Sequence, residues 1–315
     1  MGEVPVAAAI KTVKLTKMYG QTAAVQNLDL SVKRGEILGF LGLNGAGKTT
    51  TIRMLLGLIK PSAGKCYLEG KRVNPADKRM WQQVGYLVET PSAYPELTVE
   101  ENLELVQRLR GLLDRSALKA VLRKLKLEDQ AAKKAKYLSR GNAQRLGLAK
   151  ALLHQPKILL LDEPASGLDP SGVVEIRRLL LNLARNSGAA VLVSSHRLDE
   201  ISRIASTISI IHRGRLIKSL TSVDLEEELD KVLLLGGQDQ NAQRKILRQA
   251  GYRVRPPRNS GPLVVEDGKA VRNPEKIASL LVRAGQPPNL LKVEKENLEK
   301  YFLRILKEEK ANPGK

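Results

Sequence analysis

Two hydrophobic patterns alternate along the first two thirds of the chain. Short apolar runs bounded by Gly, Pro or polar residues predict buried strands. The clearest of these runs are Glu36–Leu41, Val84–Val88, Lys157–Leu161 and Ala189–Ser194. Between them, apolar residues recur at helical spacing in Thr49–Leu58, Ser139–His154, Val173–Asn186 and Leu198–Ala205. Strands that alternate with helices indicate a mostly parallel sheet with both faces covered.

Other segments predict parts that are added to this sheet. Val13–Leu15 and Leu28–Val32 alternate in polarity and are predicted edge strands, and Cys66–Gly70 is predicted to form a hairpin strand. Together they indicate an antiparallel layer. Pro95–Lys136 is predicted to be mostly helical. With the helix that follows Ser139, it predicts a helical subdomain over about residues 95–155.

The pattern changes after Lys218. From there the chain predicts strands and helices in the order βαββαβ, beginning at Val232–Leu235 and ending with a strand at Leu290–Val293 and a further helix. This order is typical of a ferredoxin-like module. We therefore expect a first domain over residues 1–219 and an accessory α+β domain over residues 220–315.

Composition narrows the class of protein. The chain has 315 residues, 42% hydrophobic but only 3% aromatic, so aliphatic side chains must supply its core. One cysteine excludes an internal disulfide and, with three histidines, argues against a structural zinc site. No apolar run reaches the roughly eighteen residues that a membrane span needs. The net charge of +20 is compatible with binding to nucleic acid, anionic lipid or polyanionic nucleotides. It is also compatible with a solvated basic surface that binds no partner.

The strongest motif is Gly42-Leu-Asn-Gly-Ala-Gly-Lys-Thr49, which fits the P-loop pattern G-x-x-x-x-G-K-[ST] in full. Its glycines let backbone N–H groups close around phosphates, and a helix that begins at Lys48 adds its positive end. We expect Lys48 to reach the β- and γ-phosphates, Thr49 to ligate Mg²⁺ and Thr50 to donate to the α-phosphate. The nucleotide-binding residues expected in this loop are Gly42, Asn44, Gly45, Ala46, Gly47, Lys48, Thr49 and Thr50.

A second motif, Ile158-Leu-Leu-Leu-Asp-Glu163, ends a buried strand on two carboxylates. Asp162, at the end of the strand, is placed to hold Mg²⁺. Glu163 follows it, where a carboxylate can polarise the attacking water. Together with the P-loop, this pair predicts an enzyme that hydrolyses a nucleoside triphosphate with Mg²⁺ as cofactor.

A third motif narrows the family. Leu138-Ser-Arg-Gly-Asn-Ala-Gln-Arg145 resembles L-S-G-G-Q-x-Q-R, the signature of ATP-binding cassette (ABC) ATPases, with Arg140 in place of a glycine and Asn142 in place of the glutamine. Pro164-Ala-Ser-Gly-Leu-Asp169 resembles the family's loop that contacts the opposite subunit, and Ser194-Ser-His196 resembles its switch-histidine segment. The resemblance covers residues 10–217. It implies an ABC-type P-loop fold, with a mostly parallel sheet, an antiparallel β layer and a helical subdomain, and it implies that the nucleotide is ATP.

The resemblance also implies roles for further residues. Tyr19 would stack on adenine, and His196 would hold the γ-phosphate and water beside Glu163. Ser139 and Gly141 would face the γ-phosphate bound by a second cassette, paired head to tail as a homo- or heterodimer. Glu89 stands where the family usually has glutamine, in the segment that links the site to a membrane partner, and would ligate Mg²⁺ or water.

Two functions from different classes remain open at this point. The resemblance implies an ATPase subunit on the cytoplasmic side of the cell membrane that powers a separate integral membrane permease. The expected process is export of a drug, peptide or lipid-like substrate, with no nucleic-acid partner. The alternative is a soluble ABC-type ATPase that acts on nucleic acid or ribosomes, which the basic charge would favour. The substrate and the role of the C-terminal domain are not predicted.

Overall fold

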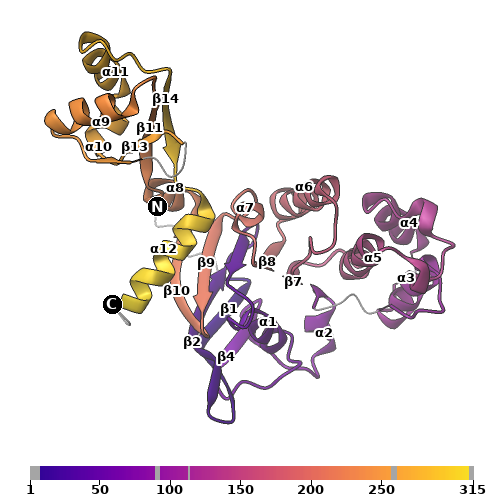
Figure 1. The fold of residues 1–315 in the computed structure, drawn as a ribbon. Helices are drawn as coiled ribbons and strands as arrows, with labels where there is room; N and C mark the ends of the chain where they lie inside the picture. Colours follow the sequence, from indigo (N-terminus) through magenta and orange to yellow (C-terminus); the bar gives the residue numbers. More distant parts are fainter. Residues whose placement is uncertain (1–7, 89–92, 113, 257–260, 312–315) are drawn as a thin grey trace, which may run out of the picture. The chain divides into compact units, whose positions relative to one another are not determined.

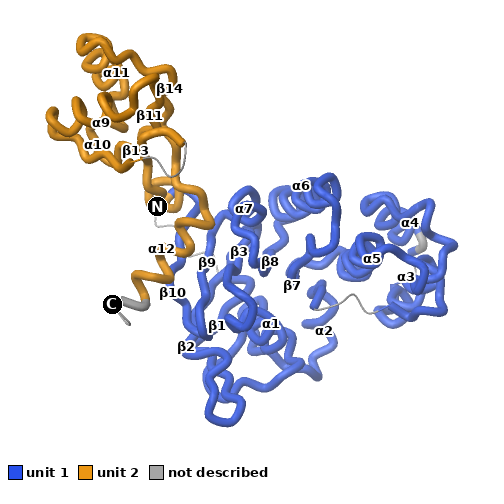
Figure 2. Tube along the Cα trace, in the orientation of Figure 1, with its two compact units in different colours: residues 1–223 blue, residues 224–315 orange. Residues whose placement is uncertain are grey.

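The computed structural model describes residues 8–88, 93–112, 114–256 and 261–311. The chain forms two compact units, Met1–Val223 and Asp224–Lys315, which Figure 2 shows in different colours. The division lies a few residues after the one expected from the change of sequence pattern. Among the described residues, no helix combines the length and the apolar character that crossing a bilayer requires.

A six-stranded sheet forms the centre of the first unit (Figure 1). Its order is β10-β9-β3-β8-β7-β6, and only β10 is antiparallel to its neighbour. The strands are β3 (Ile37–Leu41), β6 (Val84–Leu87), β7 (Ile158–Asp162), β8 (Ala190–Ser195), β9 (Thr207–His212) and β10 (Arg215–Thr221). β3, β7 and β8 are buried at every position, which is why their sequences are continuous apolar runs.

A second, antiparallel sheet has the order β2-β1-β4-β5. Its strands are β1 (Ile10–Tyr19), β2 (Thr22–Val32), β4 (Ala63–Leu68) and β5 (Lys71–Arg72). β2 lies at the edge, as expected, but the prediction of an edge strand at Val13–Leu15 is wrong, because β1 pairs with both β2 and β4. Alternation of polarity could not show this, since β4 comes from a distant part of the sequence.

The core of the first unit lies between the two sheets. Side chains of the antiparallel sheet, such as Ile10 and Leu28, pack with Phe40 and Leu160 of the central sheet and with Ile52 of α1 (Lys48–Leu55). The central sheet is also contacted by α6 (Pro170–Ser187) and α7 (Leu198–Ile201). Helix α2 (Lys78–Trp81) precedes β6, and α8 (Ser222–Glu228) begins with the last two residues of the first unit and continues into the second.

The helical part contains α3 (Val99–Leu109), α4 (Arg115–Lys124) and α5 (Arg140–Leu152), which contact one another. Pro95–Lys136 is less continuously helical than expected. Gly111, at φ 68°, follows α3, and 3₁₀ turns at Glu128–Gln130 and Ala135–Tyr137 lead to α5. Figure 1 shows this group of helices apart from α1, beyond β7.

The second unit has a four-stranded antiparallel sheet in the order β12-β13-β11-β14. Its core contains Leu233, Leu235, Leu247, Ile277 and Leu281. Its elements are β11 (Lys231–Gly236), α9 (Gln240–Gln249), β12 (Val254–Arg255), β13 (Leu263–Val265), α10 (Gly268–Arg272), α11 (Pro274–Arg283), β14 (Leu290–Lys295) and α12 (Leu298–Ala311). The assignment to the ferredoxin-like class stays a prediction.

Candidate functional site

The loop between β3 and α1 depends on glycine at two close approaches. A Cβ atom at Gly42 would lie 2.6 Å from the carbonyl oxygen of Ile211. A Cβ atom at Gly47 would lie 2.5 Å from the carbonyl oxygen of Ala24, and Gly47 has φ 107°. Gly45, at φ 77°, has open space where its Cβ would be. The loop is therefore packed tightly on its inner side and open at its tip, as a phosphate cradle requires.

Lys48, the first residue of α1, is held inside this loop. Its ammonium donates to the carbonyl oxygen of Gly42 at 2.7 Å and of Leu43 at 3.3 Å, and its side chain is 6% exposed. Burial lowers the pKa of Lys48, while the nearby carboxylates of Glu163 and Asp162 raise it. The contacts with two carbonyl groups keep this cation at the mouth of the loop.

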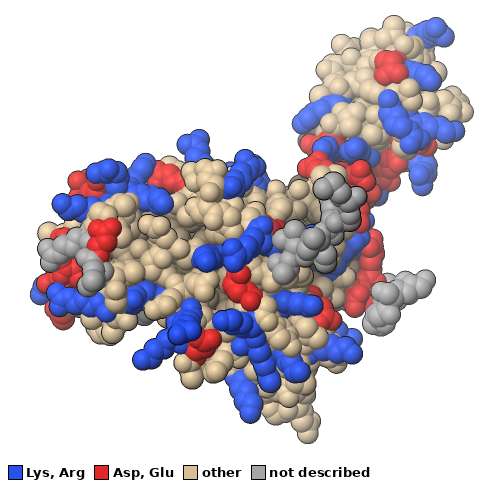
Figure 3. Space-filling model, turned by 180° about the vertical axis from the view of Figure 1, so that it is seen from behind, with Lys and Arg blue, Asp and Glu red and all other residues tan. Residues whose placement is uncertain are grey.

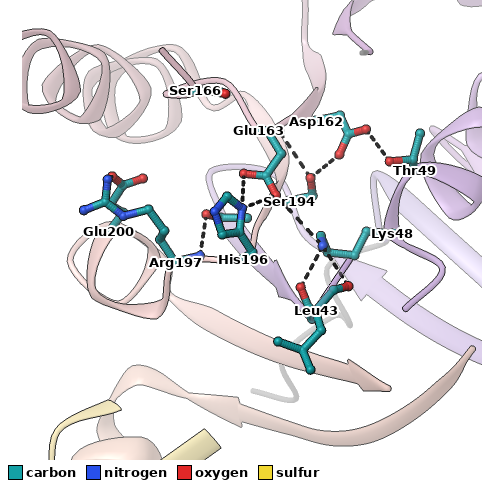
Figure 4. Close-up of polar contacts among 12 residues, drawn as sticks. Leu43, Lys48, Thr49, Asp162, Glu163, Ser166, Ser194, His196, Arg197 and Glu200 are labelled. Carbon is teal, nitrogen blue, oxygen red and sulfur yellow. Dashed lines mark hydrogen bonds and ion pairs between the residues drawn. The ribbon is translucent and has the colours of Figure 1, made fainter. Parts of the chain in front are cut away.

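Asp162 is bound on both of its carboxylate oxygens (Figure 4). Thr49 Oγ1 donates to Oδ2 at 2.6 Å, and Ser194 Oγ donates to Oδ1. The same Ser194 hydroxyl accepts the backbone N–H of Glu163 at 3.2 Å. Ser194 comes from the neighbouring strand β8, where it is paired with Asp162. One buried hydroxyl thus orients two successive carboxylate residues.

Glu163 points away from Asp162, because its backbone has φ 49°. His196 Nδ1 lies 3.0 Å from both carboxylate oxygens of Glu163, and Nδ1–H is the donor when that nitrogen carries the proton. Lys48 Nζ is 3.9 Å from Glu163 Oε1. Glu163 and His196 are both partly accessible, with side chains 28% and 51% exposed. This carboxylate can therefore meet a water molecule, and the imidazole beside it can hold an anion.

Five predicted residues thus converge at the carboxyl ends of three parallel strands: Lys48, Thr49, Asp162, Glu163 and His196 (Figure 4). Tyr19 ends β1 and is 51% exposed, with the Lys17 ammonium 5.1 Å from its ring centroid. Asn44 is exposed and Thr50 half-buried in the loop region. Glu89 lies outside the described residues.

Ser139 and Gly141 lie at the start of α5, which Figure 1 shows apart from α1. Ser139 is exposed and caps the helix by accepting the N–H of Asn142 at 3.2 Å. Gln144, 4% exposed, donates to the carbonyl oxygens of Glu163 at 3.1 Å and Pro164 at 3.0 Å. The exposed start of α5 is thus available to an anion brought by another molecule, while its second turn holds the segment after Glu163.

Sequence reasoning missed the role of Ser194 and an ion pair beyond His196. Arg197 Nη1 lies 2.7 Å from Glu200 Oε1, and burial raises the pKa of Glu200. The signal for Ser194 was present, since two serines end an otherwise apolar strand. Sequence alone could not show which of them faces Asp162, because this depends on the pairing of β7 with β8.

A groove at β6, the strand that pairs with β7, is lined by Tyr86, Leu87, Val106, Leu109 and Arg110 with the second half of α5. The sequence favours a core-packing role for Tyr86, but this side chain is 48% exposed. Leu109 on α3 is 77% exposed. Arg110 donates to the carbonyl oxygens of Trp81 at 2.8 Å and Val84 at 3.3 Å. The groove therefore presents apolar side chains beside a fixed cation.

The basic residues do not form one continuous surface on the face that Figure 3 shows. Lys and Arg are spread over it, with Asp and Glu among them. Several of the cations are paired, for example Lys136 with Glu96 at 3.0 Å and Lys126 with Glu175. A groove that tracks a nucleic-acid backbone would gather cations along one path.

Comparison with known proteins decides the family. The model of the family described as ABC transporter matches residues 25–166. The chain is 37% identical over 297 residues to the bacitracin transport ATP-binding protein BcrA of Bacillus licheniformis, covering 94% of this chain and 97% of that protein. The chain belongs to the ABC transporter family. It is an ATP-binding subunit of this family and an ATPase.

Other similar proteins agree with this membership. The lantibiotic transport ATP-binding protein SrtF of Streptococcus pyogenes is 33% identical over 221 residues, which cover 70% of this chain and 91% of that protein. Among solved structures, the dimeric post-hydrolysis state of the cassette MJ0796 with ADP and Pi has a TM-score of 0.63 and 28% identity, covering 68% of this chain and 98% of that one. The fold class expected from the sequence is confirmed for the ABC ATPase part.

Proposed function

We propose that this chain is the ATPase of a peptide exporter, in which it works as one of two paired cassettes on a separate membrane permease. The observation that carries the ATPase part is the convergence of Lys48, Thr49, Asp162, Glu163 and His196 on one edge of the sheet. The proposal of peptide export is supported by the names of the bacitracin and lantibiotic transport relatives.

The roles of the site residues follow from their contacts. Lys48 leaves its carbonyl partners to meet the β- and γ-phosphates, while backbone N–H groups from Gly42 to Thr50 surround the phosphates. Glu163 orients a water molecule for in-line attack on the γ-phosphate, and the Glu163 carboxylate takes up the proton that this water loses. His196, already 3.0 Å from Glu163, holds the γ-phosphate against that water. Tyr19 offers its exposed ring to the adenine.

Thr49 and Asp162 suit a Mg²⁺ ion. Their oxygens are 2.6 Å apart, so one hydroxyl and one carboxylate already face the same point. Mg²⁺ prefers oxygen ligands and is commonly bound by one or two carboxylates together with water and phosphate oxygens. When bound, the ion would neutralise charge that develops on the phosphates. Glu89 remains a proposed further ligand from the sequence alone.

The exposed start of α5 supports the pairing of two cassettes. Ser139 and Gly141 belong to the start of α5, which Figure 1 shows apart from the P-loop helix α1, so we assign their phosphate to a second cassette. A free helix N-terminus with a hydroxyl is a suitable anion site. Both ATP molecules then lie between the two cassettes, and hydrolysis loosens the pair.

The groove lined by Tyr86, Leu109 and Arg110 is the proposed docking site for the permease. An exposed apolar groove at β6 is suited to a short amphipathic segment that turns ATP-driven closure into movement of the membrane protein. We therefore propose that the chain works on the cytoplasmic side of the membrane. The alternative, an ATPase acting on nucleic acid or ribosomes, has less support because Lys and Arg are dispersed over the face in Figure 3, and because cations such as Lys126 and Lys136 are paired with carboxylates.

Nucleotide binding and turnover by the purified chain test the ATPase assignment. Lys48→Ala should lose tight ATP binding, because the ammonium that neutralises the phosphates is removed. Glu163→Gln should keep ATP binding but lower turnover by about 10²–10⁴-fold, the usual contribution of a general base. Wild-type turnover in Glu163→Gln, or unchanged affinity in Lys48→Ala, would contradict these roles.

A further inference from the structure

Arg140 makes a contact that the glycine usual at its position cannot make. It is the first residue of α5, directly after the capping Ser139. Its guanidinium Nη2 lies 3.3 Å from the hydroxyl of Ser166, in the loop that follows Glu163. The contact therefore joins the start of the signature helix to the loop Pro164–Asp169 within one chain.

Gly167 provides the space in which the Arg140 side chain lies. A Cβ atom at Gly167 would be 2.7 Å from Cγ, 2.8 Å from Cδ and 2.9 Å from Nε of Arg140. Gly167 also has φ 78°, a conformation that glycine adopts without strain. The aliphatic part of Arg140 thus lies directly on the loop backbone, and the guanidinium reaches one residue further to Ser166.

Helix stability does not explain a cation at this position. Arg140 stands at the positive end of α5, and no acidic residue occupies the first turn of that helix. A cation there is unfavourable to the helix dipole. The favourable interactions of Arg140 are those with the loop, so the loop is where its effect should be sought.

The same loop is joined to α5 by two other contacts. Gln144 donates to the carbonyl oxygens of Glu163 and Pro164. A Cβ atom at Gly141 would lie 3.3 Å from the carbonyl oxygen of Gly167. The loop therefore begins at the catalytic carboxylate and is fixed along its length to the helix whose start faces the second cassette.

We propose that Arg140 is a positioning residue that fixes the loop Pro164–Asp169 to the start of α5 and thereby couples the two ATP sites of the paired cassettes. The inference rests on the proposed pairing. ATP bound by one cassette contacts Ser139 of the other, and the Arg140 contact transmits that occupancy to the loop that follows Glu163 of the same chain. Two sites linked in this way respond cooperatively to ATP.

The test uses the full chain and ATP. In the Glu163→Gln background, which should trap the closed pair, adding Arg140→Gly should raise the ATP concentration that gives half-maximal dimer by about tenfold, as measured by light scattering after gel filtration. With Glu163 intact, Arg140→Gly should lower the Hill coefficient for ATP hydrolysis from about 2 towards 1. ATP affinity of the dilute monomer should stay within about twofold, because no contact of Arg140 with its own P-loop is described. Arg140→Lys keeps the charge and an aliphatic stem, so it should lie between wild type and Arg140→Gly.

Gly167→Ala is the matched variant on the loop side. It should reproduce the loss of cooperativity, since the added methyl group displaces the Arg140 side chain. In the Arg140→Gly background the same change should have a smaller effect, because only the backbone strain at φ 78° remains. This non-additivity separates loss of the contact from simple damage to the loop.

Three results would overturn the inference. Arg140→Gly with unchanged dimerisation and an unchanged Hill coefficient would show that the contact couples nothing. Weakened ATP binding by the Arg140→Gly monomer would place Arg140 at its own site instead. Additive effects of Arg140→Gly and Gly167→Ala would show that the two residues act separately. Apart from these three results, the absence of an ATP-dependent dimer of the Glu163→Gln chain would contradict the pairing of two copies of this chain, on which the inference rests.

Discussion

Asp162 and Glu163 are adjacent carboxylates with different surroundings. Asp162 is 6% exposed, and its two oxygens accept from Thr49 and Ser194. Glu163 turns away at φ 49° and faces His196 and Lys48. A fixed carboxylate with a hydroxyl beside it suits a metal ion, whereas a partly exposed carboxylate beside an imidazole suits water. The change of backbone conformation between them therefore separates the two proposed roles.

Ser194 is predicted to matter for turnover more than for folding of the P-loop. Ser194→Ala removes the donor to Asp162 and the acceptor of the Glu163 N–H, so the two carboxylates lose their common support. We expect kcat to fall about tenfold and the Mg²⁺ requirement to rise, which steady-state ATPase assays over a Mg²⁺ series would measure.

Ser194→Thr keeps the hydroxyl and is the matched control, since it should retain more activity than the alanine variant. Ser195→Ala is a second control, because the Ser195 hydroxyl accepts from the backbone N–H of Arg197 at 2.9 Å and not from that of Glu163. Equal losses in Ser194→Ala and Ser195→Ala would contradict a specific role for Ser194.

At the scale of elements, His154 ties the end of α5 to β6. Its Nε2 lies 3.0 Å from the carbonyl oxygen of Val84 and donates when protonated. Burial, together with the nearby charge of Arg110, lowers the pKa of His154 to about 4, although the hydrogen bond to Val84 acts in the opposite direction. The folded chain therefore keeps this imidazole neutral at pH values where the unfolded chain protonates it.

The sign of the resulting pH dependence follows from proton binding. Between pH 6.5 and about 4 the unfolded state binds the proton and the folded state does not, so unfolding becomes easier as the pH falls. His154 alone can change the free energy of unfolding by at most about 1.4 kcal/mol per pH unit. Denaturant unfolding of wild type and His154→Gln at pH 7 and pH 5 would measure it, and the variant should lose less stability on acidification. An equal loss in both proteins would contradict the burial of a neutral His154.

Elements with a continuous local pattern were the ones that sequence predicted well. The buried strands of the central sheet and the helices around them appear where the apolar runs indicated, and the motifs at their ends converge as expected. The inner position of β1 could not be predicted, because it depends on pairing with the distant β4. Two further contacts could not be predicted for the same reason. Ser194 contacts Asp162 on another strand, and Arg140 contacts the loop at Gly167.

At the scale of the whole molecule, one cassette holds only part of each proposed site. The P-loop, Asp162, Glu163 and His196 lie together, while Ser139 lies on the helical part that Figure 1 shows apart from α1. In the proposed head-to-tail pair, two copies of this chain, or two related cassettes, would complete both sites. The groove at Tyr86 and Leu109 then leaves a separate surface for the membrane protein. The second unit has no proposed role in this account.

The most direct test of the account is purification of the tagged full chain from gently solubilised membranes of its native host. The account predicts a multispanning membrane protein in matched stoichiometry with the chain and ATP turnover that Glu163→Gln lowers by about 10²–10⁴-fold. It also predicts that the ratio of absorbance at 260 and 280 nm shows no co-purifying nucleic acid. Recovery of the chain from the cytosol alone, bound to RNA or DNA, would contradict it.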